Sequence, residues 1–251
     1  MKVHHLNCAT LRTPAGVLVC HCLAVETPAG LLLVDTGLGL EALRLPRARL
    51  GASFPLFCRP RLEEAETALR QIERLGFKSA DVRHIVLTHL DIDHAGGLSD
   101  FPQATVHLLA DELAAFQAPA LRRERLLYRP LPAARWRTYS PGAAEWLGFA
   151  NACPLEGLPE DILLVPLPGH TRGHAGVAVR CEDGWLLHCG DAYFNRGELD
   201  GRLSLLGLYA NLVQADHAAR LESLRRLRAL AARASARLFC SHDPSELKNK
   251  A

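Results

Sequence analysis

Apolar residues recur along the chain in two alternating patterns, one typical of strands and the other typical of helices. Two β-rich runs at residues 16–25 and 30–37 flank the sequence Glu-Thr-Pro-Ala, and its proline and the glycine that follows favour a hairpin turn. Further apolar runs predict strands at residues 82–88, 104–110, 161–168 and 237–243, and a hairpin at 176–191.

Helical spacing appears between these strands. Residues 62–76 place leucines and an isoleucine on one face among charged side chains, and Gly76 predicts the end of that helix. A second helix is predicted to start within residues 111–117, and an Arg-rich helix covers residues 216–233. Strands and helices therefore alternate early in the chain.

The regular pattern breaks down between about residues 118 and 160. Prolines recur through this stretch, and aromatic residues such as Trp136 and Trp146 accompany them. The composition predicts a long inserted segment with short helices, which we interpret as a cover over a substrate pocket.

The overall composition is that of an ordinary folded protein. With 251 residues, 49% of them hydrophobic, the chain can bury a large core, and we expect a single domain over residues 1–251. The 29 basic and 27 acidic side chains give a net charge of +2, which predicts neither nucleic-acid nor membrane binding. No secretory signal or bilayer-spanning run is evident, and eight scattered cysteines are typical of reduced thiols, so we expect a cytoplasmic location.

Metal-binding side chains are concentrated in one short segment directly after the strand at residues 82–88. The sequence His-Leu-Asp-Ile-Asp-His supplies His89, Asp91, Asp93 and His94, and the small residues that follow allow the backbone to curl back. Taken alone, such a cluster could be a solvated loop. It becomes a candidate metal site because further ligand types follow other apolar strands.

Three more such residues stand near the ends of later predicted strands. His170 lies in Pro-Gly-His-Thr-Arg-Gly-His, Asp191 follows the hairpin, and His242 follows the last strand. Any one of them could be a turn or capping residue. Four separate placements of metal-binding types at strand ends are improbable by chance, so the set predicts a metal centre.

These motifs, in this order, resemble those of the metallo-β-lactamase superfamily. The resemblance rests on Val-Asp-Thr-Gly, Thr-His-Leu-Asp-Ile-Asp-His-Ala-Gly-Gly, Pro-Gly-His-Thr-Arg-Gly-His, Gly-Asp and a late Ser-His, and it spans roughly residues 17–243. It implies an α/β fold, a four-layer αββα sandwich that holds two metal ions at the edges of its sheets. The motifs are specific for the fold and much less so for the substrate.

The resemblance also implies roles for individual residues. His89, Asp91 and His170 would bind the first metal, while Asp93, His94 and His242 would bind the second, with Asp191 bridging the two. Asp35 would orient the ligand loop without binding metal itself.

Asp91 departs from the common pattern, which has histidine at this position. The two expected divalent ions are zinc in the first place. A carboxylate is a harder donor than imidazole, so Asp91 relaxes the preference for zinc and also admits iron or manganese. The extra negative charge also makes the centre less positive, which disfavours phosphodiesters and favours a neutral ester, lactone or thioester.

The expected activity is therefore hydrolysis of a small neutral carbonyl substrate by a metal-bridging hydroxide. Asp93, Asp191 and Tyr193 are the residues expected to serve catalysis. Lactonases of the resembling superfamily carry a tyrosine shortly after the bridging aspartate, so Tyr193 is interpreted as a donor to the substrate carbonyl, with ordinary packing as the alternative. Tyr193 stands one residue closer to the aspartate than that pattern has it.

Two other functions remain open from the sequence. The carboxylate at Asp91 also suits a diiron oxidoreductase, and a metal-bearing binding protein without turnover would show the same ligands. The expected partner is a small molecule, and a homodimer is left open. Cys20 and Cys22 are interpreted as core residues, because strand periodicity places them on one face and His21 on the other.

Overall fold

The computed structural model describes residues 1–118 and 135–248, which contain two six-stranded sheets. The first sheet has the order β1-β2-β3-β4-β5-β6, with antiparallel pairing from β1 to β3 and parallel pairing from β3 to β6. Its strands are β1 (Val3–Thr13), β2 (Gly16–Thr27), β3 (Gly30–Val34), β4 (Val82–Val86), β5 (Thr105–Leu109) and β6 (Arg135–Tyr139).

The second sheet has the order β12-β11-β10-β9-β8-β7. The pair β11 and β12 is parallel, whereas the other neighbours are antiparallel. Its strands are β7 (Ala144–Trp146), β8 (Phe149–Pro154), β9 (Ile162–Pro166), β10 (Ala175–Cys181), β11 (Gly184–His188) and β12 (Ala236–Phe239).

The two sheets face each other across a shared apolar core. Val25 and Val34 of the first sheet and Leu164 and Val177 of the second belong to one buried cluster. Strands β3 and β9 are buried along most of their length, as expected for strands covered on both faces. This is why their sequences are continuous apolar runs and do not alternate.

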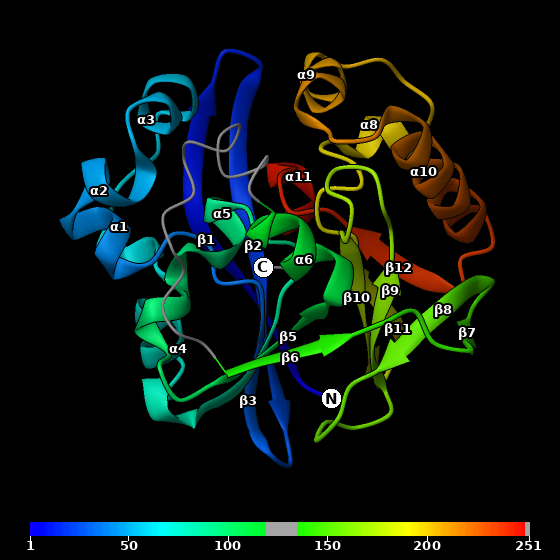
Figure 1. Ribbon diagram of the computed structural model, residues 1–251, viewed down its shortest axis with the longest axis horizontal. Coiled ribbons are helices and arrows are strands. Elements are labelled where there is room, and N and C mark those ends of the chain that lie inside the picture. The colour runs from blue at the N-terminus through cyan, green and yellow to red at the C-terminus, as the bar shows by residue number, and fades with distance from the viewer. Residues whose placement is uncertain (119–134, 249–251) are drawn as a thin grey trace.

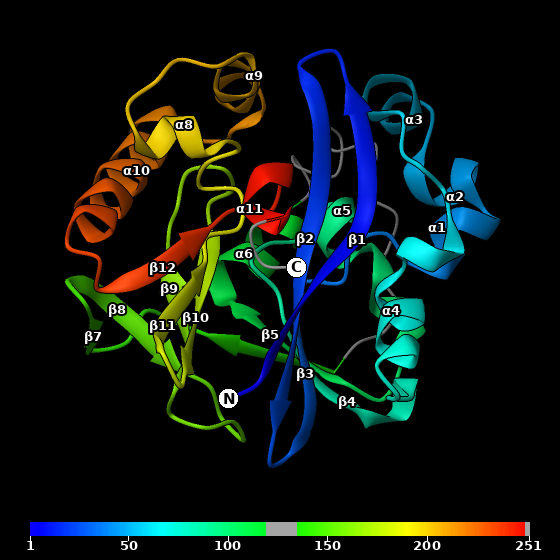
Figure 2. The same ribbon diagram turned by 180° about the vertical axis from the view of Figure 1, so that it is seen from behind.

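Helices cover the outer faces of both sheets, as the two opposite views show (Figures 1 and 2). Helices α1 to α4 lie outside the first sheet, and α8 and α10 lie outside the second. The helices are α1 (Leu40–Arg44), α2 (Pro46–Leu50), α3 (Ser53–Cys58), α4 (Ala68–Arg74), α5 (Ile92–Ala95), α6 (Ala110–Gln117), α8 (Arg196–Leu199), α9 (Leu205–Val213), α10 (His217–Ala232) and α11 (Pro244–Lys248). Short 3₁₀ turns cover Glu64–Glu66, Ser79–Asp81 and Gly96–Asp100.

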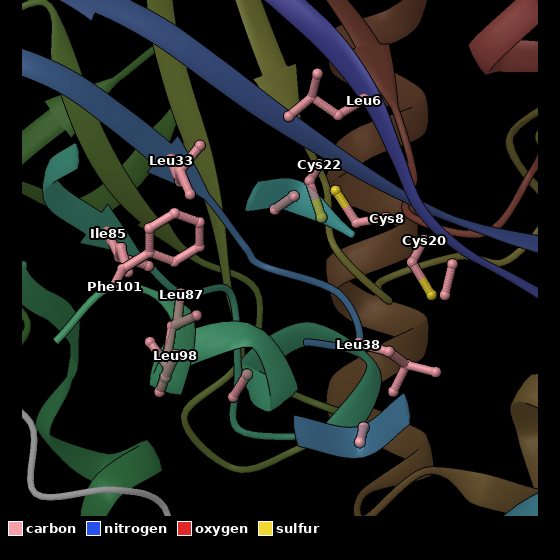
Figure 3. Packing of buried hydrophobic residues seen from close by; sticks show 14 of the residues in the cluster. Leu6, Cys8, Cys20, Cys22, Leu33, Leu38, Ile85, Leu87, Leu98 and Phe101 are labelled. Carbon is pink, nitrogen blue, oxygen red and sulfur yellow. The ribbon is translucent and has the colours of Figure 1, made fainter. Parts of the chain in front are cut away.

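Each sheet also has an apolar core between it and the helices that cover it. One joins the first sheet to the helices around it and includes Cys8, Cys20 and Cys22 among its leucines (Figure 3). The other packs Leu224 and Leu227 of α10 against the second sheet. The predicted four-layer αββα sandwich is therefore confirmed.

One strand and one helix start differ from the predictions. Strand β1 was not predicted, because its polar residues obscure the buried positions Leu6, Cys8 and Leu11. A register shift between Asn7 and Thr10 further breaks the alternation expected of a strand. The helix predicted from residue 62 begins only at Ala68, since the Thr67 hydroxyl accepts a hydrogen bond from the backbone of Arg70 and caps the helix there.

The described part of the predicted cover segment has a different structure. Residues 119–134 lie outside the described residues, but 135–154 form β6, β7 and β8, which belong to the two sheets. Trp146 and Phe149 are buried against the second sheet, where Trp146 meets the ring of Trp185 edge-on. Prolines stand between these strands or at their ends, where a missing backbone donor is tolerated.

All eight cysteines lie within the described residues and form no disulfide there. Across those same residues, every helix is too short or too polar to cross a bilayer.

Candidate metal centre

The seven predicted metal ligands come together at one end of the sandwich, although four separate segments carry them. Each segment follows a strand, so the two sheets fix the position of the backbone that carries the ligand side chains. The loop after β4 and helix α5 carry His89, Asp91, Asp93 and His94, while His170, Asp191 and His242 follow β9, β11 and β12.

The first predicted metal position consists of His89, Asp91 and His170. One ligand atom from each lies within 4.8 Å of the other two. The Oδ2 atom of Asp91 lies 3.2 Å from Nε2 of His170 and 3.6 Å from Nε2 of His89. Two nitrogens and one carboxylate oxygen therefore converge on one point.

The second predicted position brings Asp93, His94 and His242 together. The Oδ2 atom of Asp93 lies 3.7 Å from Nε2 of His242 and 4.0 Å from Nε2 of His94. Both imidazoles are almost completely buried, and Asp93 is partly exposed to the cavity above them.

Asp191 lies between the two positions and contacts histidines of both. Its Oδ2 atom is 3.0 Å from Nε2 of His242 and 3.5 Å from Nε2 of His170. Its Oδ1 atom is 3.3 Å from Nε2 of His94. This geometry suits a carboxylate that contacts two ions at once.

The charges at this centre favour a bound cation. Burial alone would raise the pKa of Asp191, but surrounding imidazoles, foremost His242 and His94, outweigh burial and hold that pKa well below its usual range. Burial alone would lower the pKa of His94, yet Asp191 and other carboxylates raise it well above its usual value. The carboxylates thus stabilise positive charge here, whether protons or metal ions supply it.

Several buried polar atoms of the centre also lack a hydrogen-bond partner within the described part of the chain. They are Nε2 of His89, Nδ1 of His170, Nε2 of His94 and Oδ1 of Asp191; the last two lie 3.3 Å apart but without the geometry of a hydrogen bond. A buried polar atom left unpaired is costly, so such atoms need a ligand. The donor set of imidazoles and carboxylates fits divalent transition-metal ions.

Two residues outside the ligand set hold the ligands in place. The Oδ2 atom of Asp35 lies 2.9 Å from Nδ1 of His94, and both oxygens of Asp35 accept hydrogen bonds from Thr88. His174 accepts a hydrogen bond from the backbone N–H of Asp191 at 2.9 Å through its Nε2. Asp35 thus contacts a candidate ligand as predicted, and its orienting role stays a prediction.

Glu112 was not identified from the sequence. Its buried carboxylate accepts hydrogen bonds from the backbone of Leu90, the hydroxyl of Thr171 and the backbone of Gly173. It thereby joins the loop after β4 to the loop that carries His170. Its only sequence signal is an acidic residue in the first turn of α6, which resembles an ordinary helix start.

The placement of Tyr193 corrects the role predicted for it. Its side chain is fully buried in the core of the second sheet, and its hydroxyl donates to the carboxylate of Glu246 at 3.2 Å. It does not line the cavity over the metal centre. Phe194, the next residue, faces that cavity, because consecutive side chains leave the backbone in different directions.

A cavity of about 400 Å³ opens over the metal centre, a size typical of small-molecule sites. Candidate ligands from both metal positions line it, so both are reachable from solvent. Those lining it are Asp91, Asp93, His170, Asp191 and His242.

The other walls of the cavity are largely apolar and come from Leu11 and Leu18 of β1 and β2 and from two helices that were not predicted. Phe54 and Phe57 of α3 form one side, and Val213 of α9 lies on another. Tyr209 of α9 also lines the cavity, as does Cys58. Apolar and aromatic residues around position 55 were the signal that could have indicated this wall.

The chain is similar to known proteins along most of its length. A model of the Metallo-beta-lactamase superfamily matches residues 15–242. A probable metallo-hydrolase of Mycobacterium tuberculosis is 45% identical over 261 residues, covering 97% of this chain and 81% of the relative. An N-acyl homoserine lactonase of Bacillus cereus is 25% identical over 228 residues, covering 90% and 82%.

Solved structures give the same fold. An N-acyl homoserine lactone hydrolase with the product N-hexanoyl-L-homoserine at its catalytic metal centre superposes with a TM-score of 0.75 and 22% identity, over 99% of this chain and 95% of that one. A dizinc quorum-quenching lactonase superposes with a TM-score of 0.59 and 19% identity, over 91% and 74%.

Proposed function

The chain belongs to the metallo-β-lactamase superfamily and is a metal-dependent hydrolase; on that basis we propose that it hydrolyses a lactone with an apolar substituent at a two-metal centre. The observation that carries this proposal is the cavity, whose floor holds ligands of both metal positions and whose walls are apolar. Esters and thioesters of similar shape are the nearest variants of this substrate.

Two divalent ions bound here would activate a water molecule and polarise the substrate carbonyl. His89, Asp91 and His170 would hold one ion, and Asp93, His94 and His242 the other, with Asp191 between them. The imidazoles suit zinc, while the carboxylate of Asp91 also admits iron or manganese.

The charge of the ligand set supports a neutral substrate. Two divalent ions contribute about four positive charges and the carboxylates of Asp91, Asp93 and Asp191 remove about three, which leaves roughly one. A histidine in place of Asp91 would leave about two. The lower charge reduces the attraction for phosphodiesters and suits an uncharged carbonyl compound.

The walls of the cavity support an apolar substituent. Phe57 is 60% exposed and Val213 is 42% exposed, and both line the cavity. An acyl chain lying between α3 and α9 would cover both residues and remove their surface from water. Each methylene buried in this way contributes about 0.8 kcal/mol.

Tyr209, and not Tyr193, lines the cavity from which a hydrogen bond could be donated to the substrate carbonyl. Burial, together with nearby Cys58 and Asp93, raises the pKa of Tyr209 to about 12, so its phenol keeps its proton near neutral pH. A protonated hydroxyl beside the ligands can donate a hydrogen bond to the carbonyl oxygen or to the departing ring oxygen. We therefore assign Tyr209 as the donor that orients the substrate.

The relatives named N-acyl homoserine lactonases support the choice of a lactone. The test combines metal analysis of the purified protein with a panel of lactones, thioesters and a phosphodiester. Acylated lactones of increasing chain length should show kcat/KM rising about fourfold per buried methylene until the cavity is filled. Two metals per chain are expected, and the phosphodiester should react slowest.

The comparison variants are Asp191→Ala and His94→Ala, with Asp183→Ala as a control because Asp183 is exposed far from the centre. Both ligand variants should lose metal and turnover, and the control should keep both. A protein that keeps two metals but prefers the phosphodiester would overturn the substrate assignment. One that binds less than half an equivalent of metal after supplementation would overturn the two-metal centre.

A further inference from the structure

Cys20 brings a thiol to the second metal position. Its Sγ atom, a carboxylate oxygen of Asp93 and a ring nitrogen of His242 all lie within 4.8 Å of one another. We propose that Cys20 is a thiolate ligand of the metal held by Asp93, His94 and His242. This assignment rests on the two-metal centre proposed above, and it adds a soft donor to that centre.

Strand β2 fixes the thiol relative to His242. The backbone N–H of His21 donates to the carbonyl of Ser241 at 2.9 Å. The Nδ1 atom of His242 lies 2.9 Å from the carbonyl oxygen of Val19. Cys20 stands between Val19 and His21, and both are hydrogen-bonded to the loop that carries His242. These short hydrogen bonds couple the position of the Cys20 side chain to that of His242.

The spacing of the ligand atoms is compatible with one ion. Metal–sulfur and metal–nitrogen bonds of about 2.3 and 2.0 Å place two donors of one ion up to roughly 4.3 Å apart. Separations within 4.8 Å therefore need only a small inward movement of the side chains. Beside them, Nε2 of His94 and Oδ1 of Asp191 lie 3.3 Å apart without the geometry of a hydrogen bond, and neither atom has another hydrogen-bond partner among the described residues. This points independently to a cation at this place.

The alternative is that Cys20 is an ordinary core residue, as its neighbour Cys22 is. Both are 1% exposed and lie on the same face of β2. Figure 3 shows Cys20 at one side of the apolar cluster, away from Ile85 and Phe101. Cys22 instead lies beside Cys8 within that cluster. Cys22 is therefore a matched control for the proposal.

A thiolate at Cys20 would make the two metal positions chemically different. The first position has the carboxylate of Asp91 and is the harder, whereas the second would have sulfur and favour zinc or another thiophilic ion. Three carboxylates and one thiolate would also balance the roughly four positive charges of two divalent ions. Metal binding would displace the thiol proton to solvent.

The test reconstitutes the full-length protein with cobalt(II) and records its near-ultraviolet spectrum. The wild type should show charge transfer from sulfur to cobalt that develops with one of the two equivalents. Cys20→Ser and Cys20→Ala should lose this band. They should also bind the more weakly held of the two cobalt ions at least about tenfold less tightly than the wild type does. Cys22→Ser should keep both the band and the affinity.

X-ray absorption of the zinc form provides a second readout, with one sulfur expected at about 2.3 Å from one zinc. Folding of each variant is checked by circular dichroism, and two Cys20 variants guard against a single substitution that unfolds the chain. Two bound cobalt ions without a sulfur band, or a band that persists in both Cys20 variants, would overturn the ligand assignment alone. Failure to bind two cobalt ions would overturn the two-metal centre with it.

Discussion

The Nδ1 atom of His94 lies 2.9 Å from Oδ2 of Asp35, and both side chains are almost fully buried. A carboxylate in this position fixes which ring nitrogen of the histidine faces the metal centre. The backbone and hydroxyl of Thr88 in turn hold Asp35. The orientation of a candidate ligand thus depends on a residue 59 positions earlier in the chain.

Replacing this carboxylate should weaken metal binding without removing a ligand. We expect Asp35→Asn to lower the affinity for the second metal by roughly 10–100-fold, because an amide holds the imidazole less strongly. Competition with a chromophoric chelator measures this change. Asp183→Asn, an exposed substitution, should leave the affinity unchanged. Equal affinities in the two variants would refute the orienting role.

Gly169 is predicted to be irreplaceable beside His170. A Cβ atom there would lie 2.3 Å from the backbone of Arg220, and the residue has φ +139°. Gly16 has nearly the same φ of +138° but open space around it. Gly16→Ala should therefore cost about 1–3 kcal/mol of unfolding free energy, from backbone strain alone. Gly169→Ala should cost more than about 4 kcal/mol or displace the loop of His170.

Urea denaturation and metal analysis of both glycine variants provide the measurement. The difference between the two variants isolates the clash with α10, since the strain in φ is shared. A Gly169→Ala protein as stable and as fully loaded with metal as Gly16→Ala would contradict the prediction.

The two tyrosines should respond in opposite ways to loss of the hydroxyl. Tyr209→Phe should lower kcat by about 10²-fold and leave metal content and stability nearly unchanged, because it removes one donor near the reacting carbonyl. Tyr193→Phe should keep kcat and lower the free energy of unfolding by about 1–3 kcal/mol, because it removes a buried hydrogen bond to Glu246. Steady-state kinetics and denaturation on both proteins distinguish the roles, and the reverse outcome would return catalysis to Tyr193.

Asp91 is predicted to set metal preference and charge. Asp91→His should retain the fold and increase the preference for zinc over manganese and iron, because imidazole replaces a harder oxygen donor. It should also raise activity toward a phosphodiester relative to a lactone, since the centre gains positive charge. Competitive dialysis against mixed metals measures the first effect, and unchanged selectivity would count against this account.

A buried histidine far from the metal centre should make the fold sensitive to acid. Burial, with help from neighbouring His84 and Arg137, lowers the pKa of His107 to about 3. The unfolded chain would take up this proton near pH 6.5, while the folded chain would not until about pH 3. The stability that this residue contributes is therefore full above pH 6.5 and is lost as the pH falls toward 3.

The variant His107→Gln should flatten that dependence. Between pH 6 and 4, the wild type should lose up to about 1.4 kcal/mol more per pH unit than the variant. His217→Gln, at an exposed position, controls for the loss of a histidine as such. Denaturation curves across this range measure the difference, and parallel pH profiles for wild type and His107→Gln would rule out the linkage.

The sequence alone determined the fold and the seven candidate ligands. Those ligands occupy short motifs directly after apolar strands, so local spacing is enough to place each of them at a strand end. The order of the motifs then implied the αββα sandwich. The role of Asp35 was also implied by the resemblance, from the motif Val-Asp-Thr-Gly at the end of a strand.

Only the tertiary structure decided what surrounds the ligands. Which tyrosine reaches the cavity depends on how α9 packs across the sandwich, and no spacing near Asp191 reveals it. The proximity of Cys20 to His242 likewise depends on pairing between segments 222 residues apart. Contacts of this kind are set by the packing of whole layers, which a linear pattern of apolar and polar residues does not specify.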